Sequence, residues 1–390
     1  MAIKNTIPEV RFAGFSDDWI QAELKEIYNF QYGIFNNNPS NGGLYPVYGA
    51  NGVIGGYTEY NSEDSVVIGH MGEYAGIVLW ANGKHFVTYN GVITNPKNDS
   101  LFPKFGYYLL SKIDLRRICD GSGQPFLSYS ILNKIKSAYP KIKDEQIAIS
   151  TFLENIDKLI AEHQQKQTKL KSLKQAMLDK MFPKKGQVVP EIRFRGFSDN
   201  WDNPLLGDIG NPYTGLSGKT KNDFGHGEGR YITYMNVFSN PISDNNKVDK
   251  IEIDSSQNEV IAGDVLFTVS SETSAEVGMS SVWIGNQKNI YLNSFCFGYR
   301  PKIKLDNYFL ANILRSKTFR EQMILLAQGI SRYNISKNKV MNLTISIPQF
   351  NEQVVIGEYF KNLDSLISQH NKQIIKLSNL KQTFLAKMFV

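Results

Sequence analysis

Residues 8–19 read Pro-Glu-Val-Arg-Phe-Ala-Gly-Phe-Ser-Asp-Asp-Trp, and residues 190–201, 182 positions later, read Pro-Glu-Ile-Arg-Phe-Arg-Gly-Phe-Ser-Asp-Asn-Trp. A second repeat closes each copy, because residues 145–182 align without gaps on residues 352–389, with 17 of 38 positions identical. The chain is therefore a tandem duplication that keeps the ends of each copy and varies its centre. The repeated opening segments, residues 8–19 and 190–201, are called frames here. Similar ends around two different central parts favour a scaffold that presents two different binding surfaces.

The second copy is longer than the first by 21 residues between Trp201 and Trp283, compared with the stretch from Trp19 to Trp80. Each copy predicts a globular part of roughly 120 to 150 residues followed by a long helix, which suits two domains in one chain. The period is far longer than that of short solenoid repeats, so a stacked array is not expected.

The composition is that of an ordinary soluble globular protein, with 42% hydrophobic and 21% charged residues. No apolar run is long enough for a membrane span and the first residues lack a signal-peptide core, so we expect a cytoplasmic protein. We expect the two cysteines, Cys119 and Cys296, to be reduced, buried thiols. The net charge of +6 mildly favours a polyanionic partner.

Apolar residues recur every seven positions in the closing helix of each copy. The first row comprises Ile149, Ile156, His163, Leu170 and Met177, and then Ile356, Leu363, His370, Leu377 and Phe384. The second row, three residues later, comprises Phe152, Leu159, Lys166, Leu173 and Lys180, and then Tyr359, Leu366, Gln373, Leu380 and Lys387. These rows predict coiled-coil a and d positions on helices about 55 Å long. Each helix could fold back on its own domain, but two matched stripes in one chain favour intramolecular pairing.

Polar residues interrupt the middle of both stripes, where His163 and His370 occupy the central a positions. An antiparallel pairing would bring the two polar centres together and match apolar layers at both ends. We hypothesise that His163 and His370 fix the register, because a slipped register would bury a polar side chain against leucine. The alternative is that both are partly exposed helix histidines.

The globular parts predict a mixed α/β fold. Short β-rich runs at 65–68, 76–80 and 265–269 are separated by Gly and Asn turns. Helical spacing follows at 105–118 and 308–327. Bases interleaved in these helices indicate either a solvated face or phosphate contacts; they are Lys112, Arg116, Arg117, Arg315, Lys317 and Arg320.

No catalytic signature stands out in the chain. The nearest match to an amino-methyltransferase tetrapeptide, at 210–213, is one proline short, and residues 215–220 lack the first glycine of a phosphate-binding loop. The remaining histidines, His70, His85 and His226, have no ligand-like spacing, so we expect no metal site. The pattern favours a non-catalytic binding subunit.

The frames at 8–19 and 190–201, with the helix ends at 173–182 and 380–389, closely resemble the specificity subunit of type I restriction-modification systems. The resemblance implies an α/β (α+β) fold with two target-recognition domains separated by an antiparallel two-helix coiled coil, related by pseudo-twofold symmetry. It implies domain 1 at 1–142, the first coiled-coil helix at 143–183, domain 2 at 184–349 and the second helix at 350–390. It also implies assembly with two methyltransferase subunits and two restriction (motor and nuclease) subunits. S-adenosylmethionine would then belong to the methyltransferase subunits, ATP and magnesium to the restriction subunits, and no cofactor to this chain.

Two different domains on a rigid helical spacer would contact two short blocks of double-stranded DNA about one helical turn, roughly 34 Å, apart. The target should therefore be bipartite and asymmetric. Polar groups on glycine-rich turns can approach base edges, while lysines and arginines neutralise phosphates. The DNA-binding candidates are Tyr48, Asn51, Arg116, Arg117, Gln124, Ser128, Ser217, Lys219, Thr220, Lys221, Ser331, Arg332, Tyr333 and Asn334.

Two other functions remain open at this stage. A duplicated scaffold that binds only proteins predicts no salt-dependent DNA binding. A self-sufficient enzyme would methylate DNA from S-adenosylmethionine without a partner.

Overall fold

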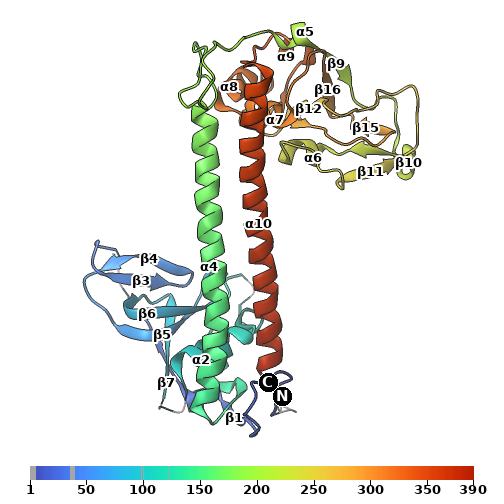
Figure 1. The fold of residues 1–390 in the computed structure, drawn as a ribbon. Helices are drawn as coiled ribbons and strands as arrows, with labels where there is room; N and C mark the ends of the chain where they lie inside the picture. Colours follow the sequence, from blue (N-terminus) through green and yellow to red (C-terminus); the bar gives the residue numbers. More distant parts are fainter. Residues whose placement is uncertain (1–5, 36–39, 98, 100, 122) are drawn as a thin grey trace. The chain divides into compact units, whose positions relative to one another are not determined.

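A computed structural model describes residues 6–35, 40–97, 99, 101–121 and 123–390 (Figure 1). The chain forms two compact units, of which unit 1 is built from two separate segments of the sequence and unit 2 from one continuous segment. Unit 1 comprises residues 1–164 and 371–390, and unit 2 comprises residues 165–370. Both units are mixed α/β, as the sequence predicts.

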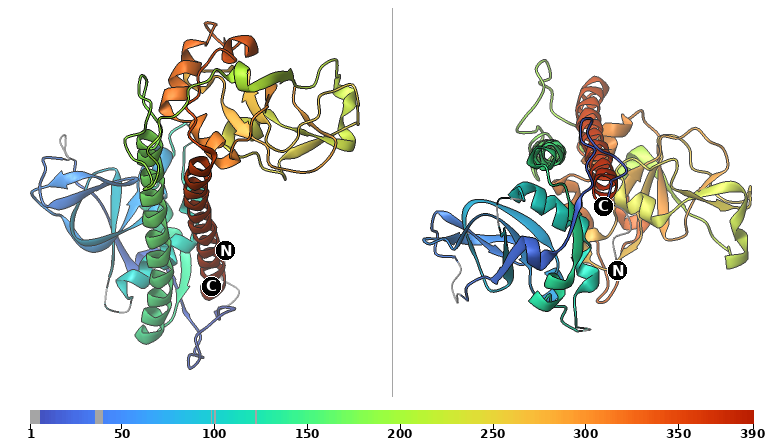
Figure 2. Two further views of the ribbon diagram at one scale, coloured as in Figure 1. Left: turned by 45° about the horizontal axis from the view of Figure 1, so that its top comes forward. Right: turned by 90° about the horizontal axis from the view of Figure 1, so that it is seen from below.

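Unit 1 contains a six-stranded sheet of order β2-β7-β5-β6-β3-β4 and a separate antiparallel pair, β1-β8. The strands are β1 (Ile20–Glu23), β2 (Tyr28–Tyr32), β3 (Tyr45–Gly49), β4 (Gly52–Tyr57), β5 (Ser62–Gly69), β6 (Val78–Val87), β7 (Gly91–Pro96) and β8 (Lys136–Tyr139). The β-branched run Val66-Val67-Ile68 in β5 is fully buried at the centre of the sheet. The β3–β4 hairpin lies on the side of unit 1 away from α10 (Figures 1 and 2).

The shorter helices of unit 1 are α1 (Leu24–Ile27), η1 (Gly72–Tyr74), α2 (Pro103–Lys112), η2 (Leu115–Ile118) and α3 (Tyr129–Lys134). The single helix predicted over 105–118 is therefore interrupted. Ile113, between α2 and η2, has an extended backbone, and Arg117 forms an ion pair with Asp114 at 2.9 Å.

Unit 2 contains a four-stranded sheet of order β14-β12-β16-β9, a three-stranded sheet β11-β10-β15 and the pair β13-β17. The strands are β9 (Gly210–Thr214), β10 (Phe224–Ile232), β11 (Val248–Ile251), β12 (Val265–Thr268), β13 (Ser270–Ser271), β14 (Ser280–Val282), β15 (Ile290–Leu292), β16 (Cys296–Pro301) and β17 (Tyr333–Asn334). Strands β10 and β11 lie between Trp201 and Trp283, the segment in which copy two is 21 residues longer than copy one. They lie on the side of unit 2 away from α10 (Figure 2).

The shorter helices of unit 2 are α5 (Leu206–Ile209), η3 (Lys221–Asp223), α6 (Tyr234–Ser239), η4 (Ser274–Glu276), α7 (Asn307–Ile313), α8 (Lys317–Leu325) and α9 (Lys337–Val340). The helix predicted over 308–327 is thus two helices, α7 and α8. The break at 314–316 coincides with the inward turn of Arg315, whose guanidinium donates to the carbonyls of Ser280, Val237 and Phe238 at 2.7 to 3.0 Å.

The two long helices, α4 (Lys143–Lys180) and α10 (Phe350–Met388), each contribute residues to both units. In unit 1, Phe152 meets Phe384 edge-on with ring centroids 4.8 Å apart, and Lys381 pairs with Asp157 at 2.6 Å. In unit 2, Lys174 pairs with Asp364, also at 2.6 Å. Early residues of α4 therefore meet late residues of α10, which confirms an antiparallel pairing.

The second row of the predicted coiled coil is displaced in part: Phe152 packs on Phe384 as predicted, whereas the next positions of the row face outward. Leu159 and Leu366, expected at d, are 45% and 43% exposed. Four residues after the first two a positions of each helix, Leu153 and Phe360 are buried, and Ile160 and Ile367 are half buried. The row shifts because each helix carries apolar residues at both adjacent positions, and packing selects the one nearer its partner.

His163 and His370 are both half buried. They fall in unit 1 and unit 2 respectively. Their role in fixing the register stays a prediction.

The duplicated frames make equivalent contacts in the two units. Arg11 forms a two-pronged ion pair with buried Glu145 at 2.7 and 2.8 Å, and Arg193 does the same with Glu352 at 2.7 Å for both contacts. In each unit an aromatic cluster joins a frame tryptophan to the end of the helix from the other copy: Trp19 meets Phe389, and Trp201 meets Phe182. Each globular part is therefore closed by the other copy's helix.

Candidate nucleic-acid interface

Two equivalent loops, one in each unit, carry several of the predicted DNA-binding residues. Loop A (residues 120–126) and loop B (residues 328–334) are each closed by two backbone hydrogen bonds between their end residues, at 2.8 to 3.0 Å. Each has a left-handed glycine in second position, Gly121 with φ +92° and Gly329 with φ +132°. A Cβ at these glycines would lie 2.7 Å from the Gln124 carbonyl oxygen and 2.1 Å from that of Arg332, so both turns require glycine. Gln124 and Arg332 thus occupy matching positions.

Loop A lies beside two other groups of predicted DNA-binding residues in unit 1, the β3–β4 turn with Asn51 and the arginine Arg116. The amide of Gly72 donates to the Pro125 carbonyl at 2.8 Å, and Arg116 reaches the Glu73 carbonyl at 3.4 Å. A Cβ at Gly69 would lie within 2.9 Å of the Ala50 carbonyl oxygen, which places the β3–β4 turn beside the same segment. The structure therefore brings Asn51, Arg116 and Gln124 to one region of unit 1, all three with exposed side chains.

Other candidates of unit 1 have structural contacts of their own. The hydroxyl of Ser128 accepts a hydrogen bond from the Ile131 amide at 3.3 Å and caps α3. Tyr48 is half buried with its ring edge-on to His85, and burial raises the pKa of its hydroxyl. Arg117 is 86% exposed even though it pairs with Asp114.

Loop B presents Ser331, Arg332 and Asn334 to solvent, while Tyr333 is half buried. Its closing strand β17 pairs antiparallel with β13, where Ser271 faces Tyr333 and Ser270 faces Asn334. Residues 322–351 contain three basic residues and no Asp or Glu. Loop B therefore lies in an acid-free basic segment, which suits a polyanionic partner.

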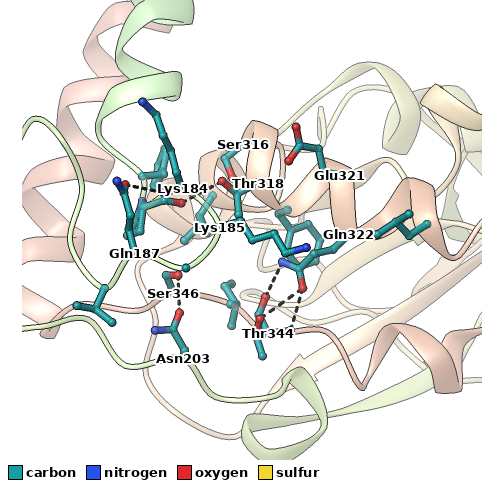
Figure 3. Close-up of a pocket in the computed structure, with 18 of the residues that line it drawn as sticks. Lys184, Lys185, Gln187, Asn203, Ser316, Thr318, Glu321, Gln322, Thr344 and Ser346 are labelled. Carbon is teal, nitrogen blue, oxygen red and sulfur yellow. Dashed lines mark hydrogen bonds between the residues drawn. The ribbon is translucent and has the colours of Figure 1, made fainter.

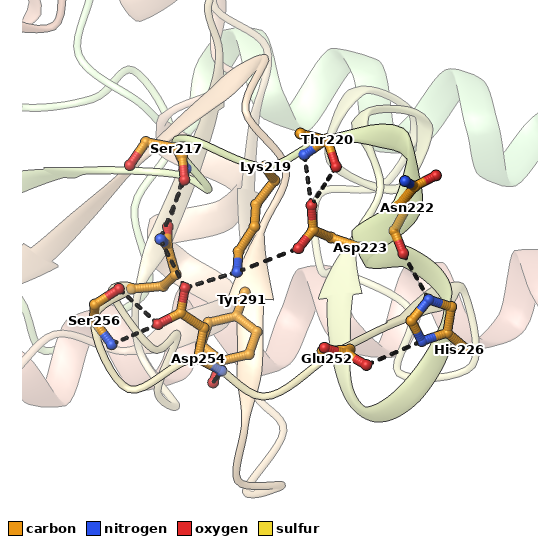
Figure 4. Close-up of polar contacts among 11 residues, drawn as sticks. Ser217, Lys219, Thr220, Asn222, Asp223, His226, Glu252, Asp254, Ser256 and Tyr291 are labelled. Atoms are coloured by element: carbon orange, nitrogen blue, oxygen red, sulfur yellow. Dashed lines mark hydrogen bonds and ion pairs between the residues drawn. The ribbon is translucent and has the colours of Figure 1, made fainter.

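The remaining candidates of unit 2 belong to a polar network between Trp201 and Trp283, the segment that contains the extra 21 residues and is called here the insertion of copy two (Figure 4). Lys219 pairs with Asp254 at 2.7 Å and approaches Asp223 at 3.9 Å. The hydrogen bond from Lys219 is the largest of several that hold the pKa of Asp254 below its usual value. Thr220 and Asp223 form a capping box at η3. Lys219 and Thr220 thus anchor the loop, whereas Ser217 and Lys221 have exposed side chains.

Three of the interleaved helix bases bind backbone carbonyls. Burial lowers the pKa of Arg315 to about 10 and that of Arg320 to about 10. Arg320 donates to the Gly278 carbonyl at 2.7 Å, and Lys112 donates to the Phe389 carbonyl at 3.3 Å. The two arginines are therefore neither a solvated face nor phosphate contacts.

An aromatic cluster behind loop A was not predicted from the sequence. Tyr32 stacks on Tyr129 with centroids 4.0 Å apart and lies 4.2 Å from the ring of buried His70. Nδ1 of His70 is 3.0 Å from the Leu127 carbonyl oxygen, one residue beyond loop A. The cluster stiffens the base of the loop. These residues are far apart in sequence and share no motif that could have signalled the contact.

Unit 2 also contains a mainly apolar cavity of about 610 Å³ between the segment that follows α4 and helix α8 (Figure 3). Phe182, Phe319 and Ile345 line it, with Lys184 and Lys185 among its polar groups. Thr318 donates to the Pro183 carbonyl at 3.0 Å and fastens the segment to α8.

Cys119 and Cys296 are free thiols. Cys296 is buried, and burial raises its pKa to about 12. Cys119 is only half buried, which corrects the expectation for that residue, because it follows the last residue of η2 and packs at the edge of the unit 1 core.

Among the described residues, no group of three or more His, Cys, Asp or Glu side chains is placed to hold a metal ion. Within the same part of the chain, no helix combines the length and apolar character needed to cross a membrane.

The sequence matches the family model described as type I restriction modification DNA specificity domain, over residues 16–172 and 198–379. The fold is similar to that of the S subunit of a type I restriction-modification system from M. genitalium, with a TM-score of 0.65, 16% identity and coverage of 98% of this chain and 99% of that one. A chain solved in work on complex assembly and conformational transition of the type I R-M system gives a TM-score of 0.54 at 15% identity, covering 95% and 97%. No curated protein sequence matches the chain.

Proposed function

The chain belongs to the family of type I restriction-modification DNA specificity domains, and on that premise we propose that it selects a bipartite, asymmetric DNA target for partner subunits. Unit 1 binds one half-site and unit 2 the other. The observation that carries this proposal is the pair of equivalent loops, A and B, which share their closure and their left-handed glycine but present Gln124 in one unit and Arg332 in the other.

The chemistry of these two residues supports different half-sites. Glutamine pairs with the N6 and N7 edge of adenine, whereas arginine pairs with O6 and N7 of guanine, each in the major groove. Exposed Arg116, Arg117 and Lys221 contact phosphates and set orientation. Lys219 acts through its ion pair with Asp254 and positions the segment that carries Ser217 and Lys221.

Helices α4 and α10 serve as the spacer between the half-sites, which is supported by their contribution of residues to both units. The two frames make the same ion pair in both units, so each copy can bind one partner of the same kind. This suits two methyltransferase subunits and, for cleavage, two restriction subunits. S-adenosylmethionine then resides in the former, and ATP with magnesium in the latter. This chain supplies sequence choice and no catalytic group.

The test is single-molecule methylation sequencing of DNA from cells that carry this chain with its partner methyltransferase, compared with cells that lack only this chain. We expect one bipartite methylated motif to disappear when the chain is removed. An unchanged methylome, in cells where the complex is shown to assemble, would favour the protein-only scaffold instead.

A second arm separates the alternatives in vitro. DNA affinity of the assembled complex should fall steeply with salt concentration, because phosphate contacts release counterions. A protein-only scaffold would show no such binding. The chain alone should transfer no methyl group from S-adenosylmethionine, and transfer without a partner would indicate a self-sufficient enzyme.

A further inference from the structure

Ile330 lies in loop B and is 97% exposed. The loop that carries it is held firmly, because Gln328 and Asn334 exchange two backbone hydrogen bonds at 3.0 and 2.8 Å. The left-handed Gly329 precedes Ile330 and forces a tight turn against the Arg332 carbonyl. A single exposed apolar residue is common on protein surfaces, so the position of Ile330 gains meaning only from its surroundings.

Along the sequence, Ile330 lies in a basic segment. Arg332 stands two positions away, Lys337 and Lys339 follow in α9, and no acid occurs from residue 322 to residue 351. An apolar tip within such a segment fits a polyanion that also exposes an apolar group. The major groove of DNA presents one such group at base edges, the C5 methyl of thymine.

We propose that Ile330 is a specificity-determining residue that packs on a thymine methyl group in the half-site bound by unit 2. This inference rests on the proposed function. Because residues 330 and 332 are two positions apart, their Cα atoms span at most about 7 Å, which corresponds to roughly two base steps of 3.4 Å. The thymine therefore lies in the same half-site as the guanine that Arg332 contacts, within a few base pairs of it once the length of the arginine side chain is added.

Copy one has no apolar residue at the position that aligns with Ile330. The position of copy one that aligns with Ile330 is Ser122, which lies outside the described residues. Serine offers a hydroxyl in place of a branched apolar side chain. The thymine-methyl contact is therefore specific to the half-site of unit 2, which adds to the asymmetry of the target.

The experiment replaces thymine by deoxyuridine, which removes the methyl group and leaves base pairing intact. Each thymine of the established target is replaced singly, and the affinity of the complex of this chain with its methyltransferase subunits is measured by fluorescence anisotropy at fixed salt. We expect one replacement, in the unit 2 half-site, to weaken binding by about fourfold, the factor for one buried methyl group. Ile330→Ser should bind the thymine target more weakly and lose its preference for thymine over uracil at that position.

Leu325→Ser is the matched control, because Leu325 is also highly exposed, at 81%, but lies in α8 outside loop B. This variant should keep the full penalty for uracil. The inference is overturned if no uracil replacement weakens the wild-type complex, or if Ile330→Ser keeps the same penalty. Failure of the proposed function looks different, because the assembled wild-type complex would then show no preference for any target duplex.

Discussion

At the residue scale, the two frame tryptophans differ in one hydrogen bond. Nε1 of Trp19 donates to buried Glu145 at 3.3 Å, whereas Nε1 of Trp201 is buried without a hydrogen-bond partner among the described residues. Trp19→Phe removes a donor from a buried carboxylate, while Trp201→Phe removes an unsatisfied donor. We expect Trp19→Phe to lower the free energy of unfolding by about 1 to 3 kcal/mol more than Trp201→Phe, measured by urea titration. Equal losses would show that the hydrogen bond to Glu145 contributes nothing.

Gln124 and Arg332 test the assignment of one half-site to each unit. Gln124→Ala should relax one base of the unit 1 half-site and leave the other half-site unchanged, and Arg332→Ala should do the reverse. Each change should cost about 1 to 3 kcal/mol in binding if the side chain contacts a base. Methylation sequencing of cells that carry each variant measures this directly. A uniform loss of affinity over all sequences would instead identify a phosphate contact.

The candidate residues show what sequence can and cannot predict at this scale. Glycine-rich turns indicated Gln124 and Arg332 correctly as exposed loop residues, because left-handed glycine is a local requirement. The ion pair of Lys219 with Asp254 and the inward turn of Arg315 depend on partners 35 or more residues away. No local pattern contains those contacts, so the sequence alone could not separate anchoring bases from free ones.

At the scale of elements, the insertion of copy two is fastened by Asp254. The pKa of this carboxyl is lowered mainly by the hydrogen bond from Lys219, so its contribution to stability is complete above the unfolded-state pKa near 4 and is lost as pH falls through the folded-state value. We expect Asp254→Asn to flatten the loss of stability between about pH 5 and pH 2, and Lys219→Met to flatten it in part, because the hydrogen bonds from Ser256 and Gln257 to Asp254 remain. Urea unfolding across that range measures it. A wild-type slope in both variants would contradict the assignment.

The antiparallel helices offer a matched pair of ion pairs, Lys174–Asp364 and Lys381–Asp157, which occupy equivalent positions of the two copies. Asp364→Lys places two ammonium groups together and should destabilise unit 2 by about 1 kcal/mol, since the pair is partly exposed. Adding Lys174→Asp should restore most of that loss. A double-mutant cycle from thermal unfolding measures the coupling, and the same cycle at Lys381 and Asp157 is the internal control. No recovery in either double variant would argue against this register.

The heptad pattern predicted the long helices but not their inner face. Phe152 and Leu153 are both apolar, as are Leu159 and Ile160, so spacings of three and four residues from each a position match the sequence equally. Packing buries Leu153 fully and Ile160 in part, while Leu159 stays 45% exposed. The periodicity therefore predicted that the two long helices exist and about how long they are. Which of two adjacent apolar residues faces the partner helix could be read only from the tertiary structure.

At the scale of the whole molecule, both units contain the same backbone contact between a frame and the end of a long helix. The Val10 amide donates to the Lys387 carbonyl at 3.0 Å in unit 1, and the Ile192 amide donates to the Lys180 carbonyl at 2.9 Å in unit 2. In unit 2 the residues 181–191 connect these points directly, a span of eleven residues. Joining Val390 to Met1 would connect the points of unit 1 through twelve residues, 388–390 and 1–9. A direct fusion of Val390 to Met1 would thus give unit 1 a connection only one residue longer than the connection that unit 2 already contains.

A circular permutant with fused ends and a new opening between Gly186 and Gln187 should therefore fold and keep the methylation motif of the parent chain. Gly186 is an exposed turn residue with φ +82°, where opening the chain disturbs little packing. The control permutant opens between Ile374 and Ile375 and divides α10, so it should lose the pairing of that helix with α4 and fail to direct methylation. Circular dichroism and methylation sequencing measure both outcomes. If both permutants keep the parent motif, the continuity of α10 is not needed for target choice; if both lose it, the connection between Gly186 and Gln187 does more than join the two copies.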